Sequence, residues 1–130
     1  MKKILSIIIL SIIVYFFLGY SKLPHGSDLR KFDSDTWKKA SSPNHNSNLI
    51  SEREKMLKDL INNILPDKNR DEIEQLLGAS LETSYFKSID KDLIYYLGPE
   101  RNGFMNIDSE WLLIWLDESN KFKRYKIIDD

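Results

Sequence analysis

Few side chains in this chain have the types and spacing that catalysis requires. Its two histidines, His25 and His45, lie close to prolines in a stretch rich in turn-forming residues. A general base must be held within hydrogen-bond reach of the proton it removes, and a linker does not hold one there. Metal binding would need further ligands and a rigid surrounding shell. We therefore interpret both histidines as solvated linker residues and expect no metal site and no cofactor.

Carboxylates are numerous, but their positions favour structural roles. Paired carboxylates hydrolyse glycosides when two of them face each other in a cleft. Most of those here fall at expected helix starts, turns or solvent faces: Asp59, Asp71, Glu72, Glu74, Asp117 and Glu118. Asp108 and Glu110 share one face of an expected strand and could bind a cation, although a calcium site needs about six oxygens. We expect no enzyme; a hydrolase would require these carboxylates to converge in a cleft.

The composition excludes further classes of chemistry. The chain of 130 residues has no cysteine, which excludes disulfides, thiolate metal sites, a cysteine nucleophile and thioether lipidation. It contains neither a G-x-S-x-G nucleophile elbow nor a glycine-rich phosphate loop that opens a helix. The formal net charge of -1 leaves no basic surplus for phosphates, so we expect no nucleic acid partner.

The stretch SEWLLIWLDES, residues 109–119, raises the question of a hidden surface. It carries apolar side chains on both sides of an expected strand, with Trp111, Leu113 and Trp115 on one side and Leu112, Ile114 and Leu116 on the other. An antiparallel strand with one solvated face would alternate apolar and polar residues. Both faces of this strand therefore need a cover.

Aromatic residues are the candidates for partner contact or for covering the sheet: Trp37, Tyr95, Trp111, Trp115 and Tyr125. Each aromatic buries about 150–250 Å², so two or three together would exceed the apolar patch normal on a monomer. The cover could be the chain's own segment FDSDTW with Trp37, a second copy, or a different protein. We favour the chain's own segment, because the linker is long enough and its aromatic residues have no other evident purpose.

The N-terminal sequence MKKILSIIILSIIVYFFLGYSK predicts either a signal peptide or a membrane anchor over residues 1–21. Both alternatives send the rest of the chain across the inner membrane, because the two lysines stay cytoplasmic. Gly19 and Ser21 permit cleavage before Lys22, which would release the chain to the periplasm or the medium. The apolar run over 4–19 nearly reaches the ~20 residues of a spanning helix and lacks an A-x-A site. We therefore favour a single-pass inner-membrane protein with its domain on the extracytoplasmic side.

The rest of the chain divides into a tether, residues 22–47, and a folded domain, residues 48–130. In the tether, Ser34 or Asp35 could cap one short helical turn that docks through Phe32 and Trp37. Two helices follow. The first, over 51–65, starts with the capping box Ser51-x-x-Glu54 and carries an apolar stripe made of Met56, Leu57, Leu60, Ile61, Ile64 and Leu65. The second is capped by Asn69 with Glu72 and ends at a left-handed Gly78.

After residue 78 the apolar period changes to two, which indicates strands. Candidate strands lie at 81–90, 93–98, 110–117 and 121–128, with the loop GPERNG and residues up to 106 as a further contact candidate. Helices followed by strands predict an α+β fold. We expect an N-terminal hydrophobic helix, then two helices packed on a three- to four-stranded antiparallel sheet as a two-layer sandwich.

This order of elements resembles the SmpA/OmlA family. The matching residues are RDEIEQLLG at 70–78, the strand at 93–98 with its Y-Y-L-G, and the apolar strand at 112–117 that ends in Asp. The resemblance implies a helix-helix-sheet module like that of β-lactamase inhibitor proteins, in a family that includes a small lipoprotein of the outer-membrane β-barrel assembly machinery. The lipidated cysteine of those lipoproteins is missing here, which excludes acyl anchoring, and PDKN replaces a glycine-containing turn.

Together these patterns predict a non-catalytic, exported or membrane-tethered interaction module of the bacterial cell envelope. Its partners would be the membrane, through residues 4–19, and either an envelope protein or a second copy. The alternative is a secreted inhibitor or ligand-binding protein that signal cleavage releases.

Overall fold

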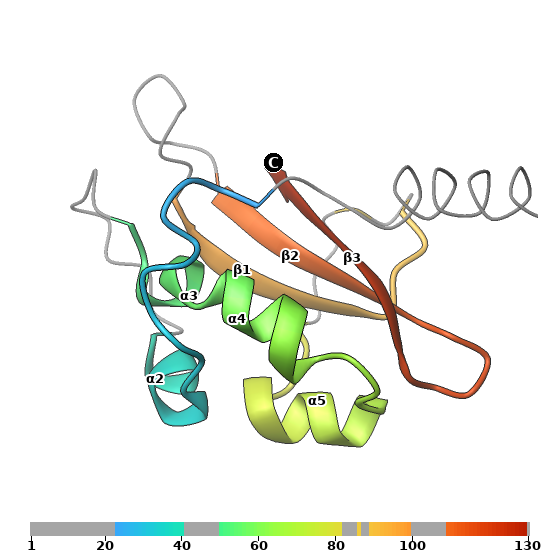
Figure 1. Ribbon diagram of the computed structural model, residues 1–130. Coiled ribbons are helices and arrows are strands. Elements are labelled where there is room, and N and C mark those ends of the chain that lie inside the picture. Colours follow the sequence, from blue (N-terminus) through green and yellow to red (C-terminus); the bar gives the residue numbers. More distant parts are fainter. Residues whose placement is uncertain (1–22, 41–49, 82–85, 87–88, 100–108, 130) are drawn as a thin grey trace, which may run out of the picture.

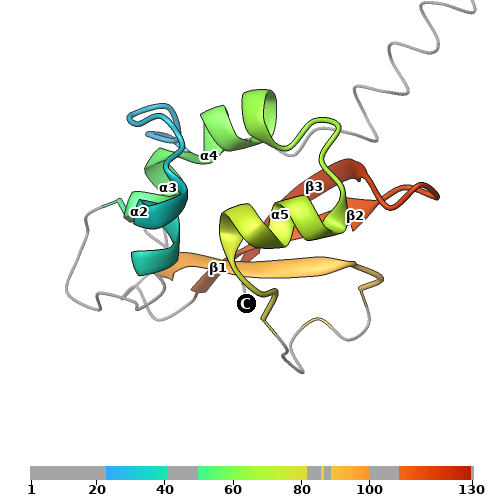
Figure 2. The same cartoon turned by 90° about the horizontal axis from the view of Figure 1, so that it is seen from below.

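The computed structural model describes residues 23–40, 50–81, 86, 89–99 and 109–129. Short helical elements come first: α2 (Ser34–Lys39), α3 (Glu52–Lys55), α4 (Leu57–Asp59), the π-helical turn η1 (Leu60–Ile64) and α5 (Arg70–Leu77). Three strands follow, β1 (Leu93–Pro99), β2 (Ser109–Leu116) and β3 (Phe122–Asp129), in an antiparallel sheet of order β1-β2-β3. The helices gather on one face of that sheet (Figures 1 and 2), so the described part of the chain has an α+β fold.

The strands lie where the alternating patterns placed them. On β2, the central strand, Leu113 pairs with Ile94 of β1 and with Lys126 of β3. The register shifts once in each strand pair, after Tyr96 in β1 and after Trp115 in β2. The expected strand over 81–90 is not seen in its described residues, Leu81, Phe86, Ile89 and Asp90. The rest of that stretch lies outside the described residues, as does most of the loop over 98–106.

The expected helix over 51–65 is divided into α3, α4 and η1, which corrects the prediction of one continuous helix. Its apolar residues recur every four positions, and four residues of an α-helix turn through about 400°, so the stripe drifts by about 40° per repeat. A wider turn removes the drift: the Leu65 N–H donates to the Leu60 carbonyl at 2.8 Å, five residues back. Leu60, Ile61 and Leu65 thereby stay buried on one side.

Capping residues set the starts of α2, α3 and α5. Ser51 and Asn69 accept the N–H of Glu54 and Glu72, and Asn69 forms the full reciprocal box with Glu72. In α2 the cap is Asp33, which corrects the expectation of Ser34 or Asp35. Asp33 is extended and accepts the Thr36 N–H at 2.8 Å, whereas the Ser34 hydroxyl donates to the Leu76 carbonyl.

Residues 23–40 pack against the helices that follow them in the chain. The Arg30 N–H donates to the Lys55 carbonyl, and the Lys58 N–H donates to the Ser27 carbonyl, both at 3.0 Å. The Phe32 N–H donates to the Asp59 carboxylate at 2.8 Å. This segment therefore runs along α3 and α4 as part of the same structure (Figure 1).

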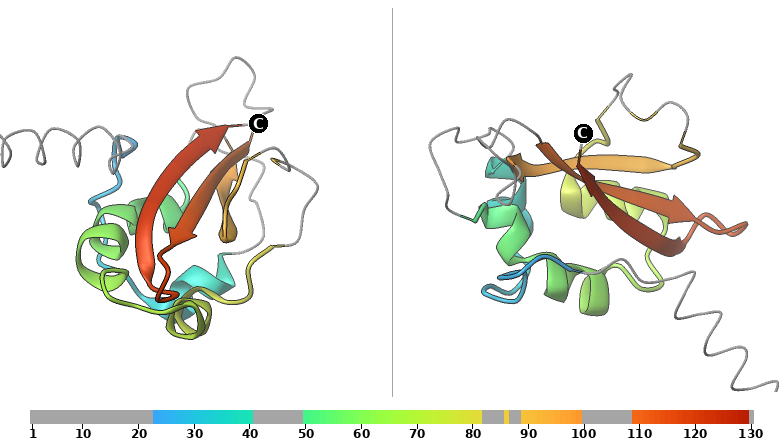
Figure 3. Two further views of the ribbon diagram at one scale, coloured as in Figure 1. Left: turned by 90° about the vertical axis from the view of Figure 1, so that its right-hand side faces the viewer. Right: turned by 90° about the horizontal axis from the view of Figure 1, so that it is seen from above.

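Two apolar clusters sandwich the sheet. The helix-side core joins Trp37, the α3–α5 residues and the sheet residues Leu93, Tyr95, Leu97, Leu112, Ile114 and Tyr125. The outer core lies on the opposite face and contains Ile94, Trp111, Leu113 and Trp115, with Phe86, Ile89, Tyr96 and Ile128 packed against it. Figure 3 shows the helices on one side of the curved sheet and the segment that follows α5, in yellow, on the other.

Candidate contact surface

The five aromatic candidates are distributed over both faces of the sheet. Trp37, Tyr95 and Tyr125 lie in the helix-side core, while Trp111 and Trp115 lie in the outer core. All five are buried, with exposed fractions between 0% for Trp37 and 9% for Trp115. None of these rings therefore stands free on the surface as an anchor for a partner.

Trp37 is the point at which the N-terminal segment enters the core. Its ring packs against Phe32 and, edge to face, against Tyr95, with centroids 6.2 and 6.4 Å apart. The guanidinium of Arg53 lies 4.8 Å from the Trp37 ring centroid, and its Nε donates to the Trp37 carbonyl at 2.8 Å. The sequence expectation that Trp37 plugs the second face of the sheet is thus corrected, because Trp37 packs on the helix side.

Arg53 is a structural residue that the sequence reasoning missed. It is buried, and its Nη1 also donates to the Tyr96 carbonyl of β1 at 2.8 Å. Burial lowers the pKa of Arg53 to about 10. No signal in the sequence marks it, since Arg53 stands in a charged run, SEREK, that is typical of an exposed first turn.

Tyr95 closes the other side of this contact. Its hydroxyl donates to the Gly78 carbonyl at 2.9 Å, which ties β1 to the end of α5. Burial raises the pKa of Tyr95 above its usual value, and the charge of Glu74 acts in the same direction. The phenol therefore stays protonated and serves as a hydrogen-bond donor.

Phe86, Ile89 and Asp90 of the same chain contribute to the cover of the second sheet face. Phe86 and Tyr96 both meet the Trp111 ring edge to face, at 6.2 and 5.2 Å between centroids. The indole N–H of Trp115 donates to the Asp90 carbonyl, and Ile89 packs on the same cluster. A local segment after α5 thus occupies the place that the sequence reasoning gave to FDSDTW, a second copy or a partner.

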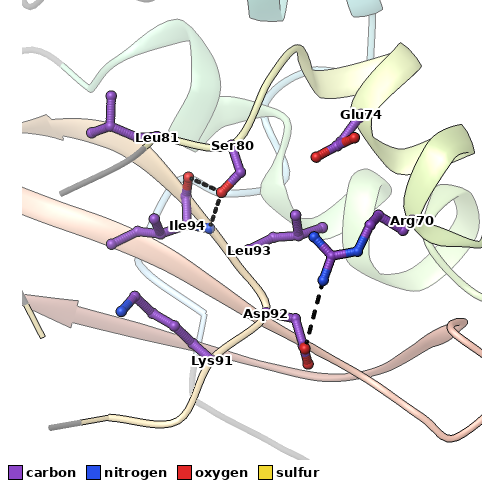
Figure 4. Close-up of a pocket in the computed structure, with 8 residues that line it drawn as sticks. All are labelled: Arg70, Glu74, Ser80, Leu81, Lys91, Asp92, Leu93 and Ile94. Atoms are coloured by element: carbon purple, nitrogen blue, oxygen red, sulfur yellow. Dashed lines mark hydrogen bonds and ion pairs between the residues drawn. The ribbon is translucent and has the colours of Figure 1, made fainter. Parts of the chain in front are cut away.

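A hollow of about 420 Å³ lies between α5 and the start of β1 (Figure 4), lined by Arg70, Glu74, Ser80, Leu81, Lys91, Asp92, Leu93 and Ile94. Several of its polar groups are engaged with one another. Arg70 reaches Asp92 at 3.7 Å, and the Ser80 hydroxyl accepts the Ile94 N–H at 2.9 Å. Lys91 donates to the Phe86 carbonyl at 3.1 Å. These contacts hold the covering segment, so we assign the hollow no ligand.

The carboxylates are dispersed in the described part of the chain. Asp71 and Glu72 stand in the first turn of α5, and Asp117 accepts two N–H groups of the β2–β3 turn. Glu110 is buried in β2, while Asp108 and His45 lie outside the described residues. Across residues 23–40, 50–81, 86, 89–99 and 109–129, no three histidine or acidic side chains come together as metal ligands would.

A row of cations lies along β3, an edge strand of the sheet, and directly before it. Lys121, Lys123 and Lys126 are exposed, and no ion pair joins them to another described residue. Arg124 stacks over the Trp115 ring with 4.0 Å to the centroid, so it closes the outer core while its charge stays near the surface. This row is a positively charged surface on a chain whose net charge is -1.

A second polar surface surrounds Leu29, which the sequence reasoning did not single out. A hollow of about 420 Å³ beside it is lined by Asp28, Leu29, Arg30, Lys31, Lys58, Asp59, Asn62 and Asn63. The side chain of Asn63 and the Phe32 N–H hydrogen-bond to Asp59 and hold the pKa of that carboxyl below its usual value. The signal in the sequence was a single leucine among charged residues in a turn, GSDLRK.

No family model, curated protein or solved structure matches this chain. In the described ranges no helix is both long and apolar enough to cross a membrane, and the expected anchor over 1–21 lies outside those ranges. The function must therefore be argued from the residues themselves.

Proposed function

We propose that this chain is a membrane-tethered, non-catalytic interaction module of the bacterial cell envelope. The observation that carries the proposal is the apolar run over 4–19, preceded by two lysines and separated from the folded residues by only residues 20–22. Such a run enters the membrane with its lysines on the cytoplasmic side and leaves the domain outside. The dispersed carboxylates of the described residues support a role other than catalysis.

The resemblance to the SmpA/OmlA family supports a role in protein contact. Its order of a capped helix ending in LLG and an antiparallel meander agrees with that of α5 and β1–β3. In this proposal an N-terminal hydrophobic helix precedes a two-layer sandwich, and the module assists other envelope proteins. Because the lipidated cysteine of that family is missing, the proposal attaches the protein to the membrane through its hydrophobic N-terminal segment alone.

Fractionation of cells that produce the full chain tests the tether. We expect a form of 15.3 kDa in the membrane pellet that resists alkaline carbonate and is released by detergent. A shorter, soluble form that begins at Lys22 would contradict the tether and favour the released inhibitor or ligand-binding protein. Gly19→Leu with Ser21→Leu is the matched control, because it removes the small residues that cleavage needs and leaves an anchored chain unchanged.

The contact surface in this proposal is the cation row of β3, which would meet an acidic surface of an envelope protein. Lys123→Glu with Lys126→Glu should reduce in-cell crosslinking to that partner at least fivefold. The same charge change on α2, Lys38→Glu with Lys39→Glu, should leave the crosslink in place. Equal crosslinking by both variants would contradict this surface, and a crosslink between two copies would instead identify the partner as the chain itself.

A further inference from the structure

Leu29 is exposed although its backbone is held in place. Of the large apolar side chains in the described part of the chain, only Leu29 and Leu81 are exposed, at 65% and 46%. Two backbone hydrogen bonds fix the turn that carries Leu29. Before Leu29, the Ser27 carbonyl accepts the Lys58 N–H; after it, the Arg30 N–H donates to the Lys55 carbonyl. Ser27 is buried, so the turn cannot fold Leu29 inward without breaking these contacts.

The surface around Leu29 carries excess positive charge. Arg30, Lys31 and Lys58 line the adjacent hollow together with the amides of Asn62 and Asn63. Arg30 is paired with Glu52 at 2.8 Å, whereas Lys31 and Lys58 are exposed and no ion pair joins them to a described residue. The two hydrogen bonds to Asp59 keep that carboxyl in its charged form, so three cations stand against two carboxylates, Asp28 and Asp59, and the lining keeps one positive charge in excess.

The chain connection brings this turn close to the membrane. Leu23 packs on the helix-side core, and Pro24 accepts the Ser27 N–H that begins the turn. Four residues of extended chain span about 14 Å, so Leu23 lies within that distance of Gly19, where the apolar run ends. A domain held this closely presents the surface beside its first residues to the lipid headgroups.

We propose that the turn over 24–31, with Lys58, docks on the lipid surface of the membrane that holds residues 4–19. Leu29 enters the headgroup region, and Lys31 and Lys58 face lipid phosphates. An exposed leucine that shares a hollow with two lysines suits such an interface, because apolar burial and attraction to anionic lipids act together. The cations of β3 are the competing basic face, but no exposed large apolar side chain accompanies them among the described residues. This inference rests on the proposed membrane tether.

The absence of cysteine allows a direct test with single-cysteine variants of the full chain. Leu29→Cys, Leu81→Cys and Lys126→Cys are each labelled with an environment-sensitive fluorophore and reconstituted into vesicles of phosphatidylethanolamine and phosphatidylglycerol that contain a brominated quencher lipid. We expect the fluorophore at position 29 to be quenched at least twofold more strongly than those at positions 81 and 126, and its emission to shift to the blue. Equal quenching at 29 and 81, or the strongest quenching at 126, would overturn the docking.

Charge variants and a flotation assay separate this inference from the tether. In the labelled Leu29→Cys protein, Lys31→Glu with Lys58→Glu should lower the quenching at least twofold, while Lys38→Glu with Lys39→Glu should not; equal effects would overturn the docking. All four lysines are exposed, so both pairs retain the core. Chains that float with the vesicles but show no quenching at position 29 would overturn the docking alone. Chains that do not float would overturn the tether as well.

Discussion

Arg53 joins three parts of the molecule through one buried guanidinium. It stacks on Trp37 and donates to the carbonyls of Trp37 and Tyr96, so it links the N-terminal segment, α3 and β1. Arg53→Met would leave both carbonyls without this donor, and we expect a loss of about 2–4 kcal/mol of unfolding free energy in urea. Arg53→Lys should recover part of it, because one ammonium cannot reproduce the planar fork. Equal stabilities of all three proteins would contradict this role.

Tyr95 gives a prediction for pH dependence. In the unfolded chain a tyrosine deprotonates at about pH 10, whereas burial keeps the folded Tyr95 protonated to higher pH. The folded state then binds more protons, so the contribution of Tyr95 is present below pH 10 and falls as the pH rises through its raised pKa. Tyr95→Phe should lower the free energy of unfolding by about 1 kcal/mol at pH ~8. At pH ~11 its unfolding free energy should approach that of the wild type.

Unfolding titrations of the Tyr95→Phe and wild-type proteins at both pH values measure this difference. Arg53, whose pKa is lowered to about 10, acts with the opposite sign over the same range and is present in both proteins, so only its interaction with the Tyr95 phenolate differs between them. A gap between the two proteins that does not change with pH would show that Tyr95 is not the buried donor.

At the scale of elements, the end of α5 depends on one glycine. Gly78 has φ 86° and ψ 179°, which differs from the left-handed helical conformation that the sequence suggested and is open to glycine almost alone. A Cβ there would have open space, with Lys38 4.0 Å away, so backbone strain dominates the cost. Gly78→Ala and Gly78→Asn should both lose about 1–3 kcal/mol in urea unfolding. If Gly78→Asn were as stable as the wild type, the assigned backbone conformation would be wrong.

Elements with local signals could be predicted from the sequence. Asn69 with Glu72 fixed the start of α5, and the strands β1, β2 and β3 begin and end within two residues of their predicted bounds. The helix over 51–65 was predicted as one continuous element, and its division into α3, α4 and η1 was missed; its four-residue repeat fits no single helix geometry. Met56, where the first break falls, also makes a distant contact that the local sequence does not reveal, because its sulfur accepts the Asp33 N–H at 3.3 Å.

At the scale of the whole molecule, the sequence predicted that both faces of β2 need covers but could not assign them. Trp111 and Leu112 are equally apolar neighbours, so composition could not tell which side meets the helices. Pairing with β3 decides it, because Tyr125 joins the helix-side core beside Ile114 while Arg124 closes the outer core over Trp115. Because the aromatic candidates are buried, the exposed surfaces lie around Leu29 and β3, which the sequence alone did not single out.

If the proposed membrane tether holds, the packing of residues 23–40 determines how far the domain lies from the membrane. A free linker over 22–47 would let the domain range over about 25–30 Å, whereas the packed segment leaves only residues 20–22 between Gly19 and Leu23. Trp37 decides between these cases, because its fully buried ring contacts Phe32, Arg53 and Tyr95.

Trp37→Ala should therefore destabilise the whole molecule by about 3–5 kcal/mol, the cost of removing a core aromatic. Urea unfolding followed by circular dichroism measures the loss. Leu29→Ala is the matched control in the same segment, and we expect it to change stability by less than about 0.5 kcal/mol, since that side chain is exposed. Should Trp37→Ala unfold at the wild-type urea concentration, residues 23–40 would be a tether after all. The turn around Leu29 would then no longer be held near the membrane by the fold.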